Sequence, residues 1–408
     1  MTPKFIQIHY LAAWPGALLN RDDAGLAKRL PFGTATRTRV SSQCQKRHWR
    51  MADDPRALHT LALEEDIASE RSKFAIERMV TYGLRDDYSK DVAEAVELAL
   101  LKTIYGDKAK LYDGTSASVK ERQALLLGRA ELAYLRDKAV EIASSATDGK
   151  EAKARIEAWA KERENKGNLK QLRDQNALAP GLEAALFGRM VTSDTRANTD
   201  AAIHVAHAFT VHEEQPELDY FTVVDDLPMV ETDAGAAGVF DTELTSGLYY
   251  GYVVVDLPLL VSNLTGCDRK DWTGEHDRDL AARVVENLIY LIAEVSPGAK
   301  KGSTAPYSRA ELVLVEAGER QPRTLANAFR DAVPLVDRTS NRSLGNRTAQ
   351  AMRGHLDTMD RLYETGEARR QMATPDLELL GIDIGSLRQL ADWAGGVVRT
   401  ASVGTGAA

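Results

Sequence analysis

The strongest β-strand signal in the chain is the stretch 244–257, which contains Tyr249-Tyr250-Gly251-Tyr252-Val253-Val254-Val255. Aromatic and β-branched residues fill this stretch, and both kinds favour strands. Working outward, residues 5–11 alternate between polar and apolar and predict a first strand that ends before Pro15. Residues 220–224 and 312–315 predict two further strands.

Two helices are predicted between these strands. Residues 41–50 form a short helix that Ser41 or Ser42 can cap, and residues 272–295 form a long amphipathic helix. Residues 182–191 read as another strand and 201–209 as a short helix. The order is therefore β, α, a β-rich region, α, β, which is the split βαβ or ferredoxin-like pattern behind many RNA-binding modules.

A charged helical block interrupts this pattern over residues 56–178. Residues 118–121 fit a capping box that opens a helix over 124–142, and the Lys/Glu-rich stretch 150–174 predicts an exposed helix with many ion pairs. Near the end of the chain, residues 386–398 predict one more amphipathic helix, followed by a loose tail from 400 to 408. The fold class is α+β with a large helical insertion.

Charge is distributed unevenly along the chain. Residues 1–50 carry nine Lys and Arg against two Asp, so this segment has a charge of +7, while the whole chain has −8 and the other 358 residues sum to −15. Residues 197–268 contain no Lys or Arg but thirteen Asp and Glu. This asymmetry predicts one surface that binds a polyanion and another that presents acid, for example to a basic protein surface.

Several classes of protein are disfavoured by the sequence. A charged-then-apolar leader is lacking, and no run of 18 apolar residues occurs, so we expect a cytoplasmic protein with no membrane partner. Cys44 and Cys267 are far apart and lack the spacing of a metal site or a disulfide framework. His204 and His207 share a helical face and, with His212, are candidates for metal binding, but packing or polar contacts are the favoured reading.

The basic residues near the first predicted helix are its candidate functional site. Gln43, Lys46, Arg47 and Arg50 recur at spacings of three and four residues, so they share one face of the helix. The N-terminus of a helix adds free N–H groups and a partial positive charge. This arrangement predicts a phosphate-binding site.

Short motifs then occur in the order seen in one family. They are Asn20-Arg21-Asp22-Asp23, Phe32-Gly33, Arg39-Val40-Ser41-Ser42-Gln43, Lys46-Arg47, Gly188-Arg189-Met190, Ala206-His207-Ala208, Phe221-Thr222-Val223-Val224-Asp225-Asp226 and Pro297-Gly298-Ala299-Lys300. From Phe5 to about Phe329 the chain resembles the backbone subunit of the type I-E CRISPR Cascade complex, the CasC family of the RAMP superfamily. Cys44-Gln45 replaces the Ser-Leu that the family usually has between Gln and Lys.

The resemblance implies a modified RNA-recognition-motif palm with helical fingers and a β-hairpin thumb. The implied divisions are 1–55 for the first part of the palm, 56–179 for the fingers, and 180–330 for the second part of the palm. The thumb lies around 188–226, and 331–408 form a C-terminal helical segment and tail. Such subunits stack head to tail along the spacer of a CRISPR RNA, whose guide pairs with target DNA. The implied partners are this RNA and DNA, other copies, other Cascade subunits and a recruited nuclease.

The resemblance also implies roles for particular residues. Those expected to contact the RNA are Arg21, Lys28, Gln43, Lys46, Arg50, Lys300 and Lys301. Met190, Tyr220 and Phe221 take the place of the thumb and wedge residues, where an apolar or aromatic side chain holds bases unstacked. Phosphate contacts position RNA without reading its bases, which suits a protein that must accept any spacer. No catalytic residue, cofactor or metal is implied.

An enzyme remains the alternative, because related backbone subunits of type III complexes cleave target RNA with an aspartate in the loop after the first strand. Asp22 and Asp23 lie in such a loop, and a carboxylate there can assist metal-dependent hydrolysis. In the favoured reading these aspartates instead bond to loop N–H groups or orient Arg21. The chain lacks a Gly-Lys-Ser/Thr phosphate loop.

Overall fold

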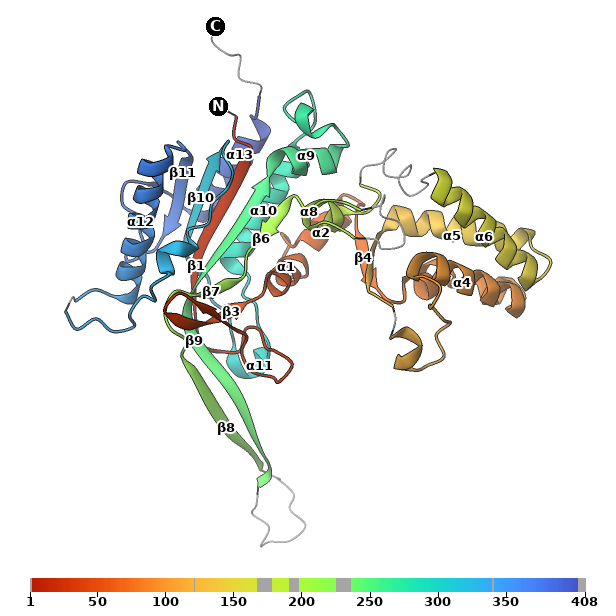
Figure 1. The fold of residues 1–408 in the computed structure, drawn as a ribbon, viewed down its shortest axis with the longest axis horizontal. Helices are drawn as coiled ribbons and strands as arrows, with labels where there is room; N and C mark the ends of the chain where they lie inside the picture. Colours follow the sequence, from red (N-terminus) through yellow and green to blue (C-terminus); the bar gives the residue numbers. More distant parts are fainter. Residues whose placement is uncertain are drawn as a thin grey trace. The chain divides into compact units, whose positions relative to one another are not determined.

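The computed structural model describes residues 2–120, 122–166, 178–190, 198–224, 236–339 and 341–402. The chain divides into two compact units (Figure 1). Unit 1 comprises Met1–Ala57, His204–Val255 and Ala282–Ala408, and unit 2 comprises Leu58–Ile203 and Asp256–Ala281. In the described residues, no helix is both long enough and apolar enough to cross a membrane.

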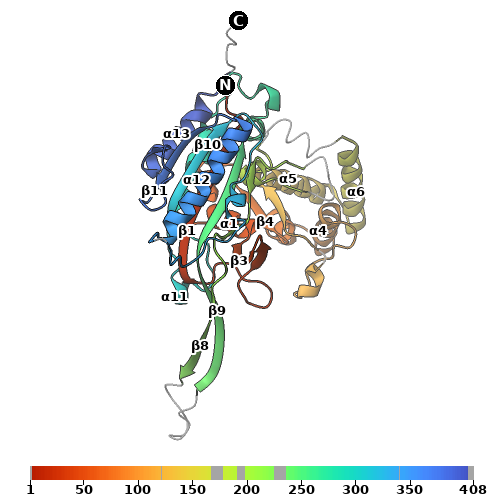
Figure 2. The same ribbon diagram turned by 60° about the vertical axis from the view of Figure 1, so that its left-hand side comes forward.

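A large mixed sheet forms the centre of unit 1. Its main strand order is β12-β11-β10-β1-β9-β7-β3-β2. The strands are β1 (Phe5–Ala17), β2 (Arg29–Phe32), β3 (Ala35–Val40), β6 (Ile203–Val205), β7 (Ala208–Thr210), β8 (Pro216–Val224), β9 (Ala236–Asp256), β10 (Ala310–Gly318), β11 (Ala368–Ala373) and β12 (Asp383–Ile384). β1 pairs with β10 antiparallel, β10 with β11 antiparallel, and β11 with β12 parallel. β8 and the first half of β9 form an antiparallel hairpin that projects from the sheet (Figure 2).

The Tyr249–Tyr252 stretch lies in β9 and fastens the sheet to the helix that follows β3. Tyr249 packs its ring edge-on against Trp14, with 5.4 Å between ring centroids. Gly251 has no side chain, and an added Cβ would lie 2.1 Å from the ring of Tyr10. The Tyr10 ring therefore crosses β9 at Gly251, and its hydroxyl donates to Gln45 Oε1 at 2.7 Å.

The other two tyrosines of this stretch join a buried polar network. Tyr250 Oη lies 2.8 Å from His9 Nδ1, and His9 Nε2 lies 2.9 Å from Glu316 Oε2. Because Tyr250 Oη also accepts from the Leu325 N–H, its own proton is free for the histidine, which then donates to the glutamate. The Tyr252 hydroxyl donates to Gln7 at 2.7 Å.

Helices cover both faces of the sheet in unit 1. These are α1 (Ser42–Arg50), α10 (Asp279–Glu294), α11 (Lys301–Thr304), α12 (Leu344–Tyr363), α13 (Leu387–Arg399) and the 3₁₀ turn η5 (Ala326–Phe329). α12 and η5 pack on the face that carries Leu11 and Leu314, through Met352 and Phe329 among others. α13 covers the opposite face, because Arg370, the register partner of Val315, lies over the Trp393 ring.

Unit 2 is mostly helical. Its elements are α2 (Leu58–Glu64), β4 (Ser69–Ser72), the π-helix η1 (Ile76–Val80), α3 (Leu84–Asp87), α4 (Lys90–Tyr105), η2 (Ser116–Val119), β5 (Leu125–Gly128), α5 (Arg129–Ser145), α6 (Gly149–Lys166), α8 (Leu182–Phe187), α9 (Leu257–Thr265) and η4 (Arg269–Asp271). Its core is built from apolar residues of α4, α5 and α6, such as Leu100, Leu135 and Ile156. In the described part of residues 56–178, where a helical block is predicted, helices predominate, with one two-stranded sheet, β4-β5, among them.

The helices predicted over 41–50 and 386–398 are confirmed, with Ser41 and Ser386 as their N-caps. Two other assignments are wrong. Residues 182–187 form the helix α8, because a short apolar run does not by itself distinguish a buried strand from a buried helix. Residues 203–205 and 208–210 form strands rather than a helix, because they pair with β9 and β3, which no local pattern reveals.

Some predicted boundaries also differ. β1 continues through Pro15 to Ala17, which is tolerated because its pairing with β10 has already ended at Ala12. Residues 118 and 119 of the predicted capping box lie in η2, and residue 121 lies outside the described residues. The helix begins only at Arg129, where Glu131 accepts from the Gly128 N–H. Residues 167–174 of the predicted charged helix and 403–408 of the predicted tail lie outside the described residues.

Candidate nucleic-acid interface

Helix α1 is held firmly at its N-terminal end. Ser41 caps it by accepting from the Cys44 N–H, and the Ser41 N–H donates to Asn20 Oδ1 at 2.9 Å. Gln45 and Trp49 are buried and anchor the inner face of the helix. The free N–H groups of the first turn are therefore presented by a rigid helix end, which is a favourable place for an anion.

The outer face of α1 carries the polar and basic residues that share a helical spacing. Gln43 and Arg47 are exposed, and Lys46 and Arg50 are half-buried. Burial lowers the pKa of Lys46. Cationic and amide side chains thus follow the helix from its second residue to its last turn.

Two loops are bonded to α1 and bring further cations to it. The Lys28 N–H donates to the Asn20 carbonyl, and the Gly298 N–H donates to His48 Nε2 at 3.3 Å. Burial lowers the pKa of His48, and the nearby charges of Lys301 and Arg47 lower it further. Lysines from residues 28 and 301 therefore lie near the same helix although they are far apart in the sequence.

Cys44 lies within this cluster of cations. Burial raises the pKa of its thiol to about 11, although Lys28 and Arg47 oppose the shift. The thiol is therefore protonated at neutral pH, and only the thiolate is a good nucleophile or metal ligand. Cys44 serves as a packing residue.

The loop between β1 and β2 is organised by Asp22. Its Oδ1 accepts from the Ala24 N–H at 2.9 Å and from the Leu26 N–H at 3.0 Å. Arg21 and Asp23 are exposed in the same loop. The carboxylate of Asp22 thus has the loop-forming contacts that the non-enzymatic interpretation expects.

Three arginines of the basic N-terminal segment make internal contacts. Arg37 is fully buried and donates to the carbonyls of Thr210 and Phe329, each at 2.9 Å. Arg29 is bonded to two glutamates of the acidic segment. Arg39 is half-buried and donates to the Arg29 carbonyl at 3.1 Å. The charge of +7 over residues 1–50 therefore overstates the charge that is open to a ligand.

The β8–β9 hairpin carries exposed aromatic side chains. Tyr220 is 70% exposed, Phe221 42% and Phe240 49%. Phe221 faces Phe240 across the hairpin, with stacked rings 5.6 Å apart. Lys300 lies 5.8 Å from the Phe221 ring centroid and donates to Thr242 Oγ1. One face of the hairpin therefore combines two phenyl rings with a cation at their base.

The predicted site residues fall into three groups. The first group lies on or beside α1, together with one residue in the loop that precedes β2, and comprises Lys28, Gln43, Lys46, Arg50, Lys301 and, in the loop, Arg21. Lys300, Tyr220 and Phe221 belong to the hairpin and its base. Met190 is 74% exposed and belongs to unit 2.

Two side chains are absent from the RNA-contacting set that the resemblance implies. Arg47, which the helical spacing places with Lys46 and Arg50, is exposed on the outer face of α1. Phe240 was missed because its pairing with Phe221 depends on the hairpin register. No local sequence signal defines that register.

The histidines weighed as metal ligands have other contacts. His212 is buried, its Nδ1 lies 2.6 Å from the Glu213 carbonyl, and its Nε2 accepts from the Leu248 N–H. His207 Nδ1 lies 3.0 Å from Arg39 Nη1. Within the ranges that the structure describes, no group of three His, Cys, Asp or Glu could hold a metal ion.

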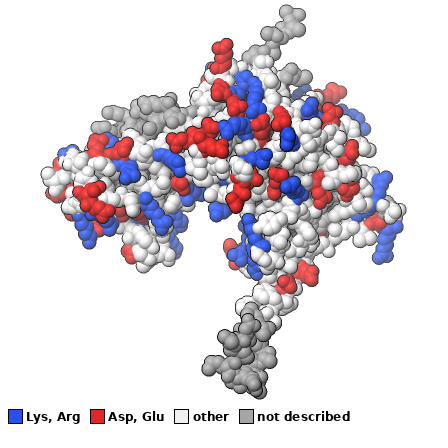
Figure 3. All heavy atoms as spheres, turned by 180° about the vertical axis from the view of Figure 1, so that it is seen from behind, with Lys and Arg blue, Asp and Glu red and all other residues white. Residues whose placement is uncertain are grey.

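The surface of the molecule shows both signs of charge near the hairpin. Figure 3 shows Lys and Arg side chains gathered above the base of the hairpin, with Asp and Glu beside them. The acidic segment 197–268 includes both strands of the hairpin. Acidic residues therefore lie next to the basic segment as well as elsewhere. The acidic surface is thus less separate from the basic one than the charge distribution along the sequence predicts.

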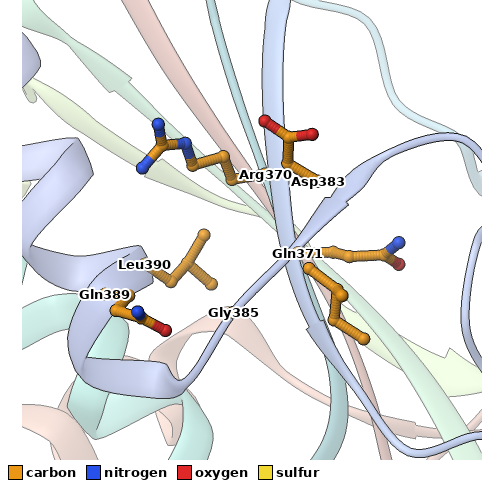
Figure 4. Close-up of a pocket in the computed structure, with 7 residues that line it drawn as sticks. Arg370, Gln371, Asp383, Gly385, Gln389 and Leu390 are labelled. Carbon is orange, nitrogen blue, oxygen red and sulfur yellow. The ribbon is translucent and has the colours of Figure 1, made fainter.

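A hollow of about 250 Å³ lies between β12 and the start of α13 (Figure 4). Gln371 is fully buried there, and its amide donates to the carbonyls of Leu379 and Ile382. Ser386 and Gln389 cap α13 reciprocally. The polar groups of this hollow thus serve the fold, and none of the predicted site residues lines it.

The chain is similar to known proteins in both sequence and fold. The model of the CT1975-like protein family matches residues 6–392. A chain of a solved structure described as "CRISPR RNA-guided surveillance complex, pre-nicking" is similar to this one with a TM-score of 0.68 and 25% identity, over 97% of this chain and 100% of that chain.

A second solved structure, described as "CRISPR RNA-guided surveillance complex", has a TM-score of 0.55 and 21% identity, over 96% of this chain and 98% of that chain. This likeness concerns the fold alone. No curated protein sequence matches the chain. Because the family model covers nearly its whole length, the chain belongs to the CT1975-like family of Cas proteins.

Proposed function

We propose that this protein is a non-catalytic, RNA-binding backbone subunit of a CRISPR RNA-guided surveillance complex. The observation that carries the proposal is that Lys28 and Lys301 lie beside the capped helix α1, which itself carries Arg47, in a chain of a Cas family. Cations and free helix N–H groups contact phosphates without reading bases. Such a site holds a guide of any sequence, and guide pairing then selects the target DNA.

The strand order supports an RNA-recognition-motif palm. Along the chain, the four strands β1, β7, β9 and β10 alternate with α1 and α10 in the pattern β-α-β-β-α-β, and they lie side by side as β10-β1-β9-β7. This is the arrangement of a split βαβ unit. We infer that β11, β12 and the β2–β3 hairpin extend this palm at its two edges.

The hairpin is suited to bases rather than to phosphates. Its exposed aromatic residues offer stacking surfaces, and Glu217 and Asp219 on β8 would repel a phosphate backbone. We infer that β8 and the first half of β9 form the thumb, which folds over the guide and displaces a base at regular intervals. Copies then stack head to tail, together with other subunits and a recruited nuclease, in a type I-E or similar complex.

The enzyme alternative has one residue pair in its favour, Asp22 and Asp23 in the loop after β1. Asp22 Oδ1 is engaged by two backbone N–H groups of its own loop. An aspartate used in this way has less freedom to bind a catalytic metal. We therefore expect Asp22→Ala to leave bound RNA intact and RNA binding little changed.

The proposed function is tested by co-expressing the chain with its neighbouring subunits and a CRISPR array, then measuring the mass and RNA content of the product. We expect one assembly that holds several copies on one RNA of fixed length. A monomer free of RNA, when guide RNA is present in the cell, would refute the proposal. Metal-dependent cleavage of target RNA that is lost in Asp22→Ala would favour the enzyme.

A charge reversal locates the interface. Lys46→Glu with Arg50→Glu should abolish guide binding, or at least weaken its salt dependence by about 1.4 in slope, since each lost contact to single-stranded RNA removes about 0.7. The matched control is Lys4→Glu with Arg320→Glu. Both control residues are exposed and lie near the opposite end of β1, so their reversal should leave binding nearly unchanged.

A further inference from the structure

The base of the β8–β9 hairpin is bonded to the basic N-terminal segment through two glutamates. Arg29 at the start of β2 donates through Nε to Glu214, just before β8, and through Nη2 to Glu243 in β9. Glu243 Oε2 also accepts from the Ala27 N–H at 2.6 Å. One arginine therefore joins both strands of the hairpin at its root, and one glutamate joins the hairpin to the loop before β2.

Burial makes these contacts strong. The Glu243 side chain is only 5% exposed, and those of Glu214 and Arg29 are 22% and 29% exposed. Burial alone would lower the pKa of Arg29, but its hydrogen bonds to Glu243 and Glu214 outweigh this and raise the pKa. Charge-assisted hydrogen bonds with such limited solvent access are among the stronger polar contacts in a protein.

The opposite face of the hairpin is held as well. Side chains alternate along a strand, so Thr242 points away from Glu243. Thr242 accepts a hydrogen bond from Lys300, whose ammonium also lies over the Phe221 ring. Lys300 adopts φ +52°, a left-handed conformation that costs free energy in a non-glycine residue and persists where the surroundings fix it. The root of the hairpin is thus fixed from β2 on one face and from the 298–301 loop on the other.

We propose that Arg29 is a positioning residue, which fixes the hairpin relative to the basic loop and does not bind RNA itself. The consequence for RNA rests on the proposed function: in a guide-binding subunit, the contacts of Arg29 set where the hairpin meets the guide. It also gives a role to two acids in a segment that has no Lys or Arg of its own, since Glu214 and Glu243 pair with Arg29, which lies 185 and 214 positions earlier in the chain.

The first arm of the test uses the full-length protein without RNA. Hydrogen exchange is measured at the backbone amides of residues 214, 215, 217 and 242–245. Glu243→Gln and Arg29→Gln should each accelerate exchange by about tenfold, as expected for loss of a buried charge-assisted contact. Arg29→Lys, which keeps the charge but not the two-pronged geometry, should restore part of the protection. The control Glu217→Gln changes an exposed carboxylate of the same hairpin and should change nothing.

Equal exchange in Glu243→Gln and Glu217→Gln would overturn the inference. The second arm uses the assembled complex and maps which guide bases react with a chemical probe. In Glu243→Gln we expect the regular pattern of reactive bases to lose contrast. If Arg29 were instead a phosphate contact, its release by Glu243→Gln would leave this pattern unchanged and tighten RNA binding, which would also overturn the inference. If no guide binds to the wild type, the proposed function fails while the first arm still decides the role of Arg29.

Discussion

Glu316 is the residue whose replacement should most clearly weaken unit 1. It lies on the α12 side of β10, and its side chain has no exposed surface. Its carboxylate accepts from His9, from Arg323 and from Arg369, the last at 2.5 Å. Burial would raise the pKa of Glu316, but the hydrogen bonds from Arg323 and His9 outweigh it and hold the pKa far below its usual value. The group is therefore ionised and fully paired.

The size of the effect follows from what Glu316→Gln leaves behind. Removing one partner of a buried ion pair costs about 3–5 kcal/mol, because the other charge stays buried. Arg369 keeps Asp360 and Glu367, and both arginine side chains retain some exposure, 16% for Arg369 and 20% for Arg323. We therefore expect a smaller loss than this range, about 2–3 kcal/mol in the free energy of unfolding.

The assay is native-state hydrogen exchange of the β1 and β10 amides, which lie beside the network. A loss of 2–3 kcal/mol corresponds to exchange about 30- to 150-fold faster, where exchange needs unfolding of unit 1. The matched control is Glu311→Gln on the same strand. Burial raises the pKa of Glu311, and Asp376 raises it further, so this change should be neutral or slightly stabilising. A Glu316→Gln protein as stable as the control would refute the reasoning.

The dependence on pH gives the same network a second test. The folded pKa of Glu316 lies below the unfolded value of about 4.3, so its contribution is complete above that pH and is lost as pH falls towards the folded pKa. Burial lowers the pKa of His9, so neutral His9 contributes above about pH 6.5 and this contribution is lost below it. Wild-type stability should thus fall in acid, and the stability difference between wild type and Glu316→Gln should begin to shrink below about pH 4.

Three further predictions concern the site. Gly251→Ala should cost about 1–3 kcal/mol of unfolding free energy, because a new Cβ would lie 2.1 Å from the Tyr10 ring and displace the ring from Gln45. Thermal unfolding measures this loss of stability, and RNA binding should weaken together with stability. Phe240→Ala should leave the affinity for the guide nearly unchanged but make the spacing of displaced bases less regular, whereas Phe240→Tyr should keep that spacing. Chemical probing of the guide bases measures the spacing in both variants. Asp22→Ala should speed proteolysis of its own loop, which loses two hydrogen bonds, without changing RNA integrity on a denaturing gel.

Much of the sheet of unit 1 could be predicted from the sequence because its strands carry their own signals. The Tyr249–Val255 stretch and residues 312–315 are rich in aromatic and β-branched residues, and both lie in strands, β9 and β10. The errors fall where pairing decides the outcome. Residues 203–210 have no strong local preference, and they become strands because β9 and β3 offer them partners.

The candidate site was predictable as a helix face but not as an assembly of loops. The spacing of Gln43, Lys46 and Arg50 places them together, and the structure has α1 where the sequence predicts it. The contact between His48 and Gly298 spans 250 positions, and only the fold reveals it. Composition also cannot tell an open cation from an internal one, as buried Arg37 shows.

Internal contacts of cations also account for acidic and basic residues being neighbours at the root of the hairpin. A hairpin that must stand out from a sheet has little apolar surface at its root to bury, so polar contacts have to fix its direction. Arg29 and Lys300 supply the cations, and Glu214, Glu243 and Thr242 supply the acceptors. The cations left over, such as Arg47 and Lys301, are exposed on and beside α1. In the proposals above, the cations of residues 1–50 and of the 298–301 loop therefore have two tasks: the paired ones, Arg29 and Lys300, hold the hairpin in place, and the exposed ones, Arg47 and Lys301, contact a phosphate backbone.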